Sequence, residues 1–314
     1  MKIGIDIGGM SFKFGLVNEQ NQIIAKTSIT TQSHKPLPEI ASDVAEAVKE
    51  LLEKAHITLE ECEGIGIGCA GTIDSGNGVI LYSNNLEWEN VPLVGELKKH
   101  LHTKIEIAND ADAAALGEVC AGAAKGESDA VLLTLGTGVG SGVIINHRIF
   151  RGAMAGGCEL GHLAIKYDGI RCTCGRKGCF EAYGSASALL RIAREHAISH
   201  PESIMNEMCE QDLTKMTGKI PFDAAEQGDQ AGQDTVAEYE QYLACGIANV
   251  INTFRPKKVI LGGGVAAQKE NLTRPLQTLV KDMCFGGEYG QIAEIVTSNL
   301  GNDAGIIGAA NLIA

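Results

Sequence analysis

The sequence of 314 residues contains no apolar run that approaches the length of a membrane span, which needs about 20 consecutive apolar residues. It also has no unbroken apolar stretch at its N-terminus, because Asp6 falls where an export signal would be apolar. We therefore expect no membrane partner and a cytoplasmic protein. No low-complexity linker separates one part of the chain from another.

The sequence has fewer basic than acidic residues. The chain has 26 Lys and Arg residues against 39 Asp and Glu residues, which gives a net charge of −13. Such a surface repels the phosphates of DNA and RNA, so we expect no nucleic-acid partner. A small nucleotide is a different case, since a few local backbone amides can hold its phosphates whatever the overall charge.

The length suits two domains of about 150 residues each. Short apolar strands alternate with helical segments, which indicates an α/β fold. We place a small N-terminal domain at residues 1–120, completed by a C-terminal helix at 304–314, and a larger domain at 121–303. The expected strands are 2–7, 12–18, 22–30, 64–68, 105–108, 131–135, 141–146, one near Arg148, 258–261 and 292–297. The expected helices are 37–55, 111–123, 186–199, 234–254, 273–283 and 304–312, with a polar stretch around 212–221.

The opening of the chain and residues 131–150 share one design. Each reads strand, glycine turn, strand, Asn turn, strand, which indicates a weak internal repeat. The repeat predicts two related sheets, each with a hairpin loop of bare backbone. Two such loops facing each other would form a cleft between the domains.

Three glycine-rich loops are candidates for holding a nucleotide. Gly8 and Gly9 follow Asp6, whose carboxylate suits Mg²⁺; a tight hairpin with a buried Asp is the alternative. The second loop, 136–140, contains Thr137 but lacks the lysine and the following helix of a P-loop or Rossmann motif. The third loop, 262–264, suits an adenine or ribose, with a strand-to-helix turn as the alternative.

Asn109 and Asp110 end a strand and open a helix. Both residue types cap helices well, so capping is the structural interpretation of Asp110. One cap suffices, however, and the other side chain is free to face a cleft. A carboxylate there is able to take a proton from a sugar hydroxyl during phosphate transfer, while Asn109 fixes the same sugar.

A cluster of His162, Cys172, Cys174 and Cys179 predicts a structural zinc site, because four protein ligands leave no open position. Core thiols beside a surface histidine are the alternative. Six further cysteines are interpreted as core thiols in apolar or helical contexts: Cys62, Cys69, Cys120, Cys209, Cys245 and Cys284.

Glu159 and Glu181 flank this cluster. Zinc would fix the backbone at both positions, so both carboxylates are candidates to accept sugar hydroxyls, with His162 nearby. Surface glutamates are the alternative interpretation.

Taken together, these motifs resemble the ROK family of bacterial sugar kinases and repressors, especially its glucokinases. The matching stretches are 6–9, 71–74, 85–88 with Pro92-Leu93, 109–110 through 117–118, 135–142, 159–162, 172–181 and 262–265. The resemblance implies an actin-like ATPase (ribonuclease H-like) fold with two domains around a cleft, Asp110 as catalytic base, and a homodimer. The implied sugar contacts are Gly71, Asn85, Asn109, Glu159, His162 and Glu181. The expected nucleotide and Mg²⁺ residues are Asp6, Gly8, Gly9, Lys13, Thr137, Gly138, Gly140, Gly263 and Gly264.

The sequence departs from the family pattern at two positions. Met10 stands where the family has Thr after the paired glycines, and Cys158 stands where a small residue is usual. Neither removes a catalytic group, but both bear on kinetics and sugar preference.

We therefore expect an ATP-dependent hexose kinase that phosphorylates the 6-hydroxyl of glucose. N-acetylmannosamine, N-acetylglucosamine, allose or fructose kinases share these motifs. A sugar-sensing regulator is the non-enzymatic alternative. The acidic charge and the start of the first strand at Lys2, which leaves no room for a helix-turn-helix, disfavour it, and a sensor needs no proton acceptor at Asp110.

Overall fold

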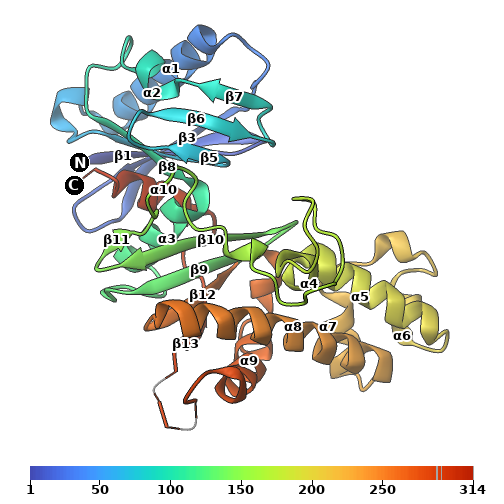
Figure 1. Ribbon diagram of the computed structural model, residues 1–314. Helices are drawn as coiled ribbons and strands as arrows, with labels where there is room; N and C mark the ends of the chain where they lie inside the picture. The colour runs from blue at the N-terminus through green and yellow to red at the C-terminus, as the bar shows by residue number, and fades with distance from the viewer. Residues whose placement is uncertain (288, 291, 314) are drawn as a thin grey trace. The chain divides into compact units, whose positions relative to one another are not determined.

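The computed structural model describes residues 1–287, 289–290 and 292–313. The chain divides into two compact units. Unit 1 comprises Met1–Leu132, Gly142–Cys158 and Ser298–Ala314, and unit 2 comprises Leu133–Ser141 and Glu159–Thr297. Figure 1 shows the elements with the labels used below.

Unit 1 is built on a five-stranded sheet of order β3-β2-β1-β4-β8. Its strands are β1 (Lys2–Ile7), β2 (Ser11–Val17), β3 (Ile23–Thr30), β4 (Ile65–Cys69) and β8 (Ile105–Asn109). The first three form an antiparallel meander, whereas β1, β4 and β8 run parallel. Parallel strands end at the same edge of a sheet, so Ile7, Cys69 and Asn109 lie side by side in register.

Helices cover this sheet. The amphipathic α1 (Leu37–Ala55) packs on β2 and β3, while α10 (Ala304–Ala310) packs on β1 and β4 and against α3 (Asp110–Ala121) (Figure 1). The approach of α10 is close: a Cβ on Gly66 would lie 1.7 Å from the carbonyl oxygen of Ala309. Glycine at this strand position therefore lets the C-terminal helix join the core of the N-terminal sheet.

A second, three-stranded sheet in unit 1 was not expected from the sequence. It has the order β5-β6-β7, with β5 (Thr72–Asp74), β6 (Val79–Ser83) and β7 (Trp88–Val91), and is followed by α2 (Leu93–Leu97). The strands are too short to show a clear alternation. Their packing is tertiary: the Trp88 ring meets the Phe12 ring edge-on at 6.4 Å, and its Nε1 donates to the Ser33 carbonyl.

The other five-stranded sheet has the order β11-β10-β9-β12-β13. Its strands are β9 (Ala130–Leu135), β10 (Val139–Ile145), β11 (Arg148–Ile149), β12 (Lys258–Gly262) and β13 (Glu294–Thr297). The unit boundary falls within β9 and β10. This strand order repeats that of the first sheet, which confirms the internal repeat and the α/β class predicted from the sequence.

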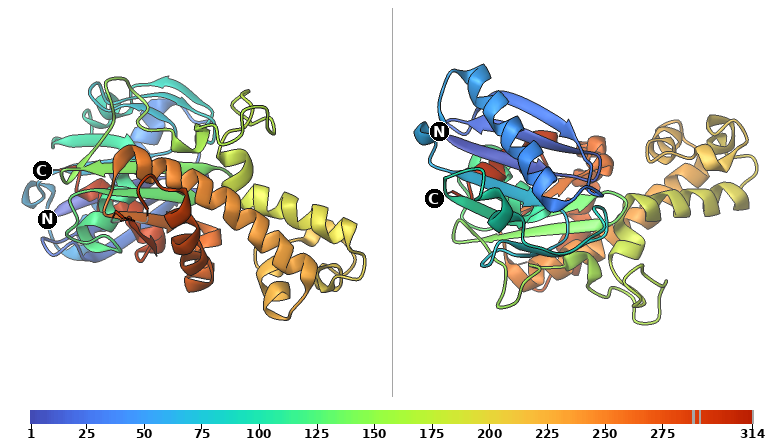
Figure 2. Two further views of the ribbon diagram at one scale, coloured as in Figure 1. Left: turned by 60° about the horizontal axis from the view of Figure 1, so that its bottom comes forward. Right: turned by 90° about the horizontal axis from the view of Figure 1, so that it is seen from above.

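Helices make up most of the rest of unit 2: α4 (Glu181–Gly184), α5 (Ala186–Ser199), α6 (Ile204–Met208), α7 (Ile220–Glu226), α8 (Gln230–Phe254) and α9 (Glu270–Met283). The long helix α8 packs against α5, α7 and α9 (Figure 2). No helix in the described part of the chain combines the length and apolarity that a bilayer crossing requires.

Several predicted bounds were wrong for identifiable reasons. Helix α8 begins at Gln230, not at 234, because Asp229 caps it by accepting from the Gly232 amide. The polar stretch around 212–221 contains a 3-10 helix and the start of α7.

Among the six expected core thiols, Cys120 and Cys245 are only half-buried, whereas Cys62, Cys69, Cys209 and Cys284 are buried.

One buried acid in unit 2 has a predictable effect on stability. Glu240 on α8 is 7% exposed, and its Oε1 atom has no hydrogen-bond partner among the described residues. Burial raises the pKa of its carboxyl to about 7. The folded chain therefore binds a proton that the unfolded chain releases, so stability is full below the ordinary pKa of 4.5 and falls as pH rises toward 7.

We expect Glu240→Gln to raise the free energy of unfolding at pH 8 by on the order of 1 kcal/mol, because no charge then needs to be buried or neutralised. Urea unfolding at pH 5 and pH 8 measures the effect, and the gain is smaller at pH 5. The exposed Glu202→Gln is the matched control. Equal shifts at both pH values would contradict the assignment.

Candidate functional site

The junction of β8 and α3 presents a carboxylate at the edge of the unit 1 sheet. The Asn109 side chain caps α3 by accepting from the amides of Ala111 (2.8 Å) and Asp112 (3.2 Å). Asp110 is therefore the first residue of the helix and not its cap, so the capping interpretation of Asp110 was wrong. The Asn109 amide group also donates to the Gly71 carbonyl at 3.1 Å, which brings two predicted sugar contacts together.

Asp6 lies near Asp110 because β1 and β8 end at the same edge. Burial raises the pKa of Asp6, Lys13 lowers it, and the charge of Asp110 raises it again. Lys13 Nζ lies 3.7 Å from Asp6 Oδ2. Burial is also the main cause that raises the pKa of Asp110. The predicted base, the predicted Mg²⁺ ligand and Lys13 thus share one corner of unit 1.

Cys69 sits between these two acids, on the strand that separates them. Burial raises the pKa of its thiol, and the charges of Asp110 and Asp6 raise it further. The thiol is thus held protonated, so it adds no negative charge to the pair of carboxylates.

The first glycine loop is a tight turn between β1 and β2. The Gly8 amide donates to the Ser11 carbonyl at 3.1 Å, and the Gly8 carbonyl accepts from Thr31 Oγ1 at 2.7 Å. The Gly8 amide is thus used within the hairpin. Gly9 packs beside Asn85. A Cβ atom added at Gly9 would lie 3.6 Å from the Cβ of Asn85, so a predicted sugar contact lies next to this loop.

The second glycine loop joins β9 to β10 and is fixed from several sides within unit 2. The Gly136 amide donates to the Gly138 carbonyl at 3.0 Å, and the Gly136 carbonyl accepts from the Ala186 amide at 2.8 Å. The Thr137 carbonyl accepts from Ser187 Oγ at 2.9 Å. The first residues of α5 therefore hold the loop through two hydrogen bonds.

The third glycine loop combines a structural and an open position. Gly263 has φ of +83°, and a Cβ there would lie 2.4 Å from the Leu135 carbonyl oxygen, so glycine is required by the close backbone contact. Nothing lies within 4 Å of the corresponding position on Gly264. The structure thus supports the turn interpretation for Gly263 and leaves space beside Gly264.

The His-Cys cluster has the geometry of a metal site. The ligand atoms of His162, Cys172, Cys174 and Cys179 all lie within 4.8 Å of one another. Cys174 Sγ is 3.6 Å from Cys179 Sγ, and Cys172 Sγ is 3.7 Å from His162 Nδ1. A tetrahedral site with zinc–sulfur bonds of about 2.3 Å and a slightly shorter zinc–nitrogen bond separates its ligand atoms by about 3.5–3.8 Å. The four residues therefore fit a metal ion.

The thiols of this cluster differ in acidity. The Arg176 backbone amide lowers the pKa of Cys174, whereas burial raises the pKa of Cys172 and raises that of Cys179 to about 12. Since a metal binds thiolates, its binding would displace these protons.

Glu159 and Glu181 lie at different points of unit 2. Glu159 precedes a short 3-10 helix, Leu160–His162, whose Leu160 amide donates to Ser141 Oγ at 3.0 Å. The Glu181 carboxylate accepts from the Val139 amide at 3.0 Å and from Thr173 Oγ1 at 3.2 Å, and Cys172 Sγ lies 3.4 Å away. Glu181 is half-buried and accepts these hydrogen bonds, so the surface-glutamate alternative does not describe it.

Sequence patterns missed three hydroxyl groups that hold these segments. Thr31 binds Gly8, Ser187 binds Thr137, and Ser141 binds Leu160. Their partners lie 23, 50 and 19 residues away along the chain. No local motif joins residues at such separations, so only the fold reveals these contacts.

The two departures from the family pattern are both in unit 1. Met10 is 89% exposed in the first glycine loop, whereas Cys158 is half-buried with its Sγ 3.7 Å from the Phe150 carbonyl oxygen.

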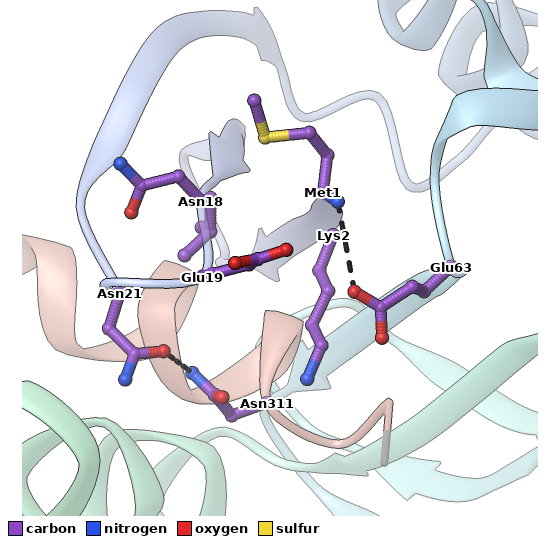
Figure 3. A pocket seen from close by; sticks show the side chains of 8 residues that line it. Met1, Lys2, Asn18, Glu19, Asn21, Glu63 and Asn311 are labelled. Atoms are coloured by element: carbon purple, nitrogen blue, oxygen red, sulfur yellow. Dashed lines mark hydrogen bonds and ion pairs between the residues drawn. The ribbon is translucent and has the colours of Figure 1, made fainter.

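A separate small pocket of about 210 Å³ contains none of the predicted site residues (Figure 3). It is lined by Met1, Lys2, Val17, Asn18, Glu19, Asn21, Glu63 and Asn311. Two of its contacts are internal: the Met1 ammonium lies 3.7 Å from Glu63, and Asn311 donates to Asn21 at 2.8 Å. We assign it no part in the site.

Comparisons with known proteins point to one family. The model of the ROK family matches residues 2–314. A glucokinase of Thermotoga maritima is 38% identical over 312 residues, covering 99% of this chain and 96% of its own. A xylose repressor of Caldicellulosiruptor bescii is 28% identical, and the match covers 99% of this chain but 77% of the repressor.

The structure also matches that of a ROK glucokinase from Streptomyces griseus in complex with glucose and AMPPNP. The TM-score is 0.79 and the identity 33%, with 99% of this chain and 98% of the other covered. The two-domain, actin-like ATPase fold expected from the sequence is thereby confirmed.

Proposed function

The chain belongs to the ROK family, and on that premise we propose that it is an ATP-dependent hexokinase that phosphorylates glucose. The observation that carries the proposal is the pair of partly buried carboxylates, Asp110 and Asp6, at one sheet edge beside Lys13. A kinase of this kind needs one carboxylate to accept a proton and another near the phosphates. The glucokinase relatives, at 38% and 33% identity, support glucose as the acceptor.

In this mechanism Asp110 accepts the proton of the sugar 6-hydroxyl. The hydroxyl oxygen forms a bond to the γ-phosphorus of ATP, the bond from that phosphorus to the β-phosphate bridge oxygen breaks, and ADP leaves with the electron pair. Burial raises the pKa of Asp110, which makes its carboxylate a stronger base than that of a solvated aspartate. The proposed sugar contacts are Gly71, Asn85, Asn109, Glu159, His162 and Glu181.

The nucleotide is proposed to bind the three glycine loops. Asp6 would hold Mg²⁺, which offsets the phosphate charge, and Lys13 supplies a further positive group beside it. In the first loop the Gly9 amide remains a candidate phosphate donor, and in the second loop the amides of Thr137, Gly138 and Gly140 do. The open side of Gly264 is the proposed place for the adenosine.

The metal site is proposed to hold a structural Zn²⁺ on His162, Cys172, Cys174 and Cys179. Sulfur and imidazole ligands select zinc over Mg²⁺, and four protein ligands leave no position for a reacting water. Its task would be to fix the segments that carry Glu159 and Glu181.

We assign the sugar and nucleotide chemistry to a small domain of 1–120 with 304–314 and a larger one of 121–303. We propose a cytoplasmic location, because the proposed reaction uses ATP and the cysteines are interpreted as core thiols or metal ligands and not as disulfides. A homodimer is inferred from the family alone, and the acidic charge disfavours nucleic acid as a partner.

An ATP-coupled assay across a panel of hexoses tests this function. We expect kcat/KM for glucose to exceed that for N-acetylmannosamine, N-acetylglucosamine, allose and fructose by at least about tenfold, since a site built for one hydroxyl pattern leaves polar groups unpaired with another. Preference for an N-acetylated sugar would replace glucose as the substrate. Sugar binding without any ADP formation would favour the sugar-sensing regulator.

A further inference from the structure

Glu181 joins two parts of unit 2 that the proposed function assigns to different substrates. One carboxylate oxygen, Oε2, accepts from the Val139 amide of the second glycine loop at 3.0 Å. The other, Oε1, accepts from Thr173 at 3.2 Å and lies 3.4 Å from Cys172 Sγ. Both residues lie in the segment 172–179, called the metal-binding segment here because it carries three of the four candidate ligands. The side chain therefore ties the glycine loop to the metal-binding segment.

The backbone that carries Glu181 is firmly held. Its neighbours Phe180 and Tyr183 are 0% and 1% exposed. The Gly184 carbonyl, at the end of the same short helix α4, accepts from Tyr239 Oη at 2.8 Å. Glu181 is therefore held by a rigid backbone, and its hydrogen bond to Val139 restrains the glycine loop.

Gly138 shows how closely the carboxylate approaches the loop. A Cβ at this position would lie 2.3 Å from Glu181 Oε2, which no side chain tolerates without displacing the carboxylate. Glycine at 138 thus leaves room for Glu181, in addition to exposing backbone to a phosphate.

The tie also determines which amides of the loop are able to face a ligand. The Val139 amide is committed to Glu181, and the Gly136 amide to the Gly138 carbonyl. At the tip of the loop, this leaves Thr137 and Gly138, whose amides lie between these two fixed points. A loop held on both sides keeps such donors oriented before the ligand binds.

We propose that Glu181 is a positioning residue for nucleotide binding: it holds the glycine loop in the shape that accepts phosphate and makes that shape depend on the metal-binding segment. This proposal depends on the proposed ATP-dependent function. It adds to the proposed sugar contact, because a carboxylate has about four acceptor positions and the Val139 amide and the Thr173 hydroxyl occupy two of them.

Binding of AMPPNP with Mg²⁺ in the absence of sugar tests the proposal. We expect Glu181→Ala to weaken AMPPNP binding at least about tenfold by calorimetry, since it removes a charge-assisted hydrogen bond that orders the loop. Glu181→Gln keeps an acceptor for the Val139 amide and should stay within about threefold of the parent chain. Hydrogen–deuterium exchange at the Val139 amide should accelerate in Glu181→Ala and stay slow in Glu181→Gln.

Glu159→Ala is the matched control, because Glu159 is also a proposed sugar contact in unit 2. It should weaken glucose binding and leave sugar-free AMPPNP binding unchanged. The metal content of each variant, measured by mass spectrometry, should equal that of the parent chain.

Two outcomes would overturn the proposal and can be told apart. Unchanged AMPPNP affinity in Glu181→Ala, in a chain whose parent binds AMPPNP, would leave Glu181 a sugar contact only and the proposed function intact. A parent chain that binds glucose but no AMPPNP would overturn the proposed function, and this inference with it.

Discussion

Replacing Asp110 by asparagine is expected to reduce turnover of glucose and ATP by about 10²-fold or more while leaving glucose affinity largely intact. Asparagine has nearly the size of aspartate. The substitution also preserves the start of helix α3, because Asn109 and not residue 110 caps it. It removes the group that accepts the hydroxyl proton. A coupled ADP assay measures kcat, and glucose titration followed by calorimetry measures affinity.

The matched control is Asp43→Asn, which changes a surface aspartate of α1 paired with Lys35. It should leave kcat within about twofold of the parent chain, because surface ion pairs contribute little. Near-normal turnover in Asp110→Asn would end the assignment of this residue as the base.

The pH profile offers an independent test of the same residue. Because burial raises the pKa of Asp110, its active, ionised form is lost as pH falls through a value above the ordinary 3.8. We expect the acidic limb of kcat/KM in the parent chain to lie above that value. The residual activity of Asp110→Asn should lack this limb.

Replacing Cys174 by alanine is expected to remove the bound metal and to raise the glucose KM at least about tenfold. Cys174 is exposed, so the substitution creates no cavity, but it removes one of four ligands whose sulfur lies 3.6 Å from that of Cys179. Without the metal, the segments that carry Glu159 and Glu181 lose their shared anchor. Metal content by mass spectrometry and steady-state kinetics with glucose measure the two effects.

Cys245→Ala serves as the control for this substitution, because Cys245 is a half-buried thiol on α8 outside the cluster. It should keep one metal ion per chain and the parent KM. If Cys174→Ala instead loses the metal but keeps its glucose affinity, the cluster does not shape the sugar site.

Local patterns predicted the parts of the fold that local forces control. The bounds of β1, α1 and α5 are those read from the sequence, because each has strong periodicity and clear ends. The cluster of His162, Cys172, Cys174 and Cys179 was also legible, since four ligands within eighteen residues can be brought together by short glycine turns.

The small sheet β5-β6-β7 was not legible, because its strands have three to five residues and depend on packing against the larger sheet. The choice between Asn109 and Asp110 as helix cap was also open in the sequence. It was decided by the Gly71 carbonyl, 38 residues away, which holds the Asn109 amide group in the capping orientation.

The sequence by itself determined the α/β class, the internal repeat and the family, and it predicted the metal-ligand set, because each depends on short motifs that are read one at a time along the chain. Only the tertiary structure decided that Asp110 is free of capping, that it shares a corner with Asp6, and that Glu181 binds the amide of Val139. Those contacts join residues tens of positions apart. The geometry of these contacts depends on which strands end at the same edge of a sheet and which helices contact each loop. No local sequence pattern encodes that arrangement.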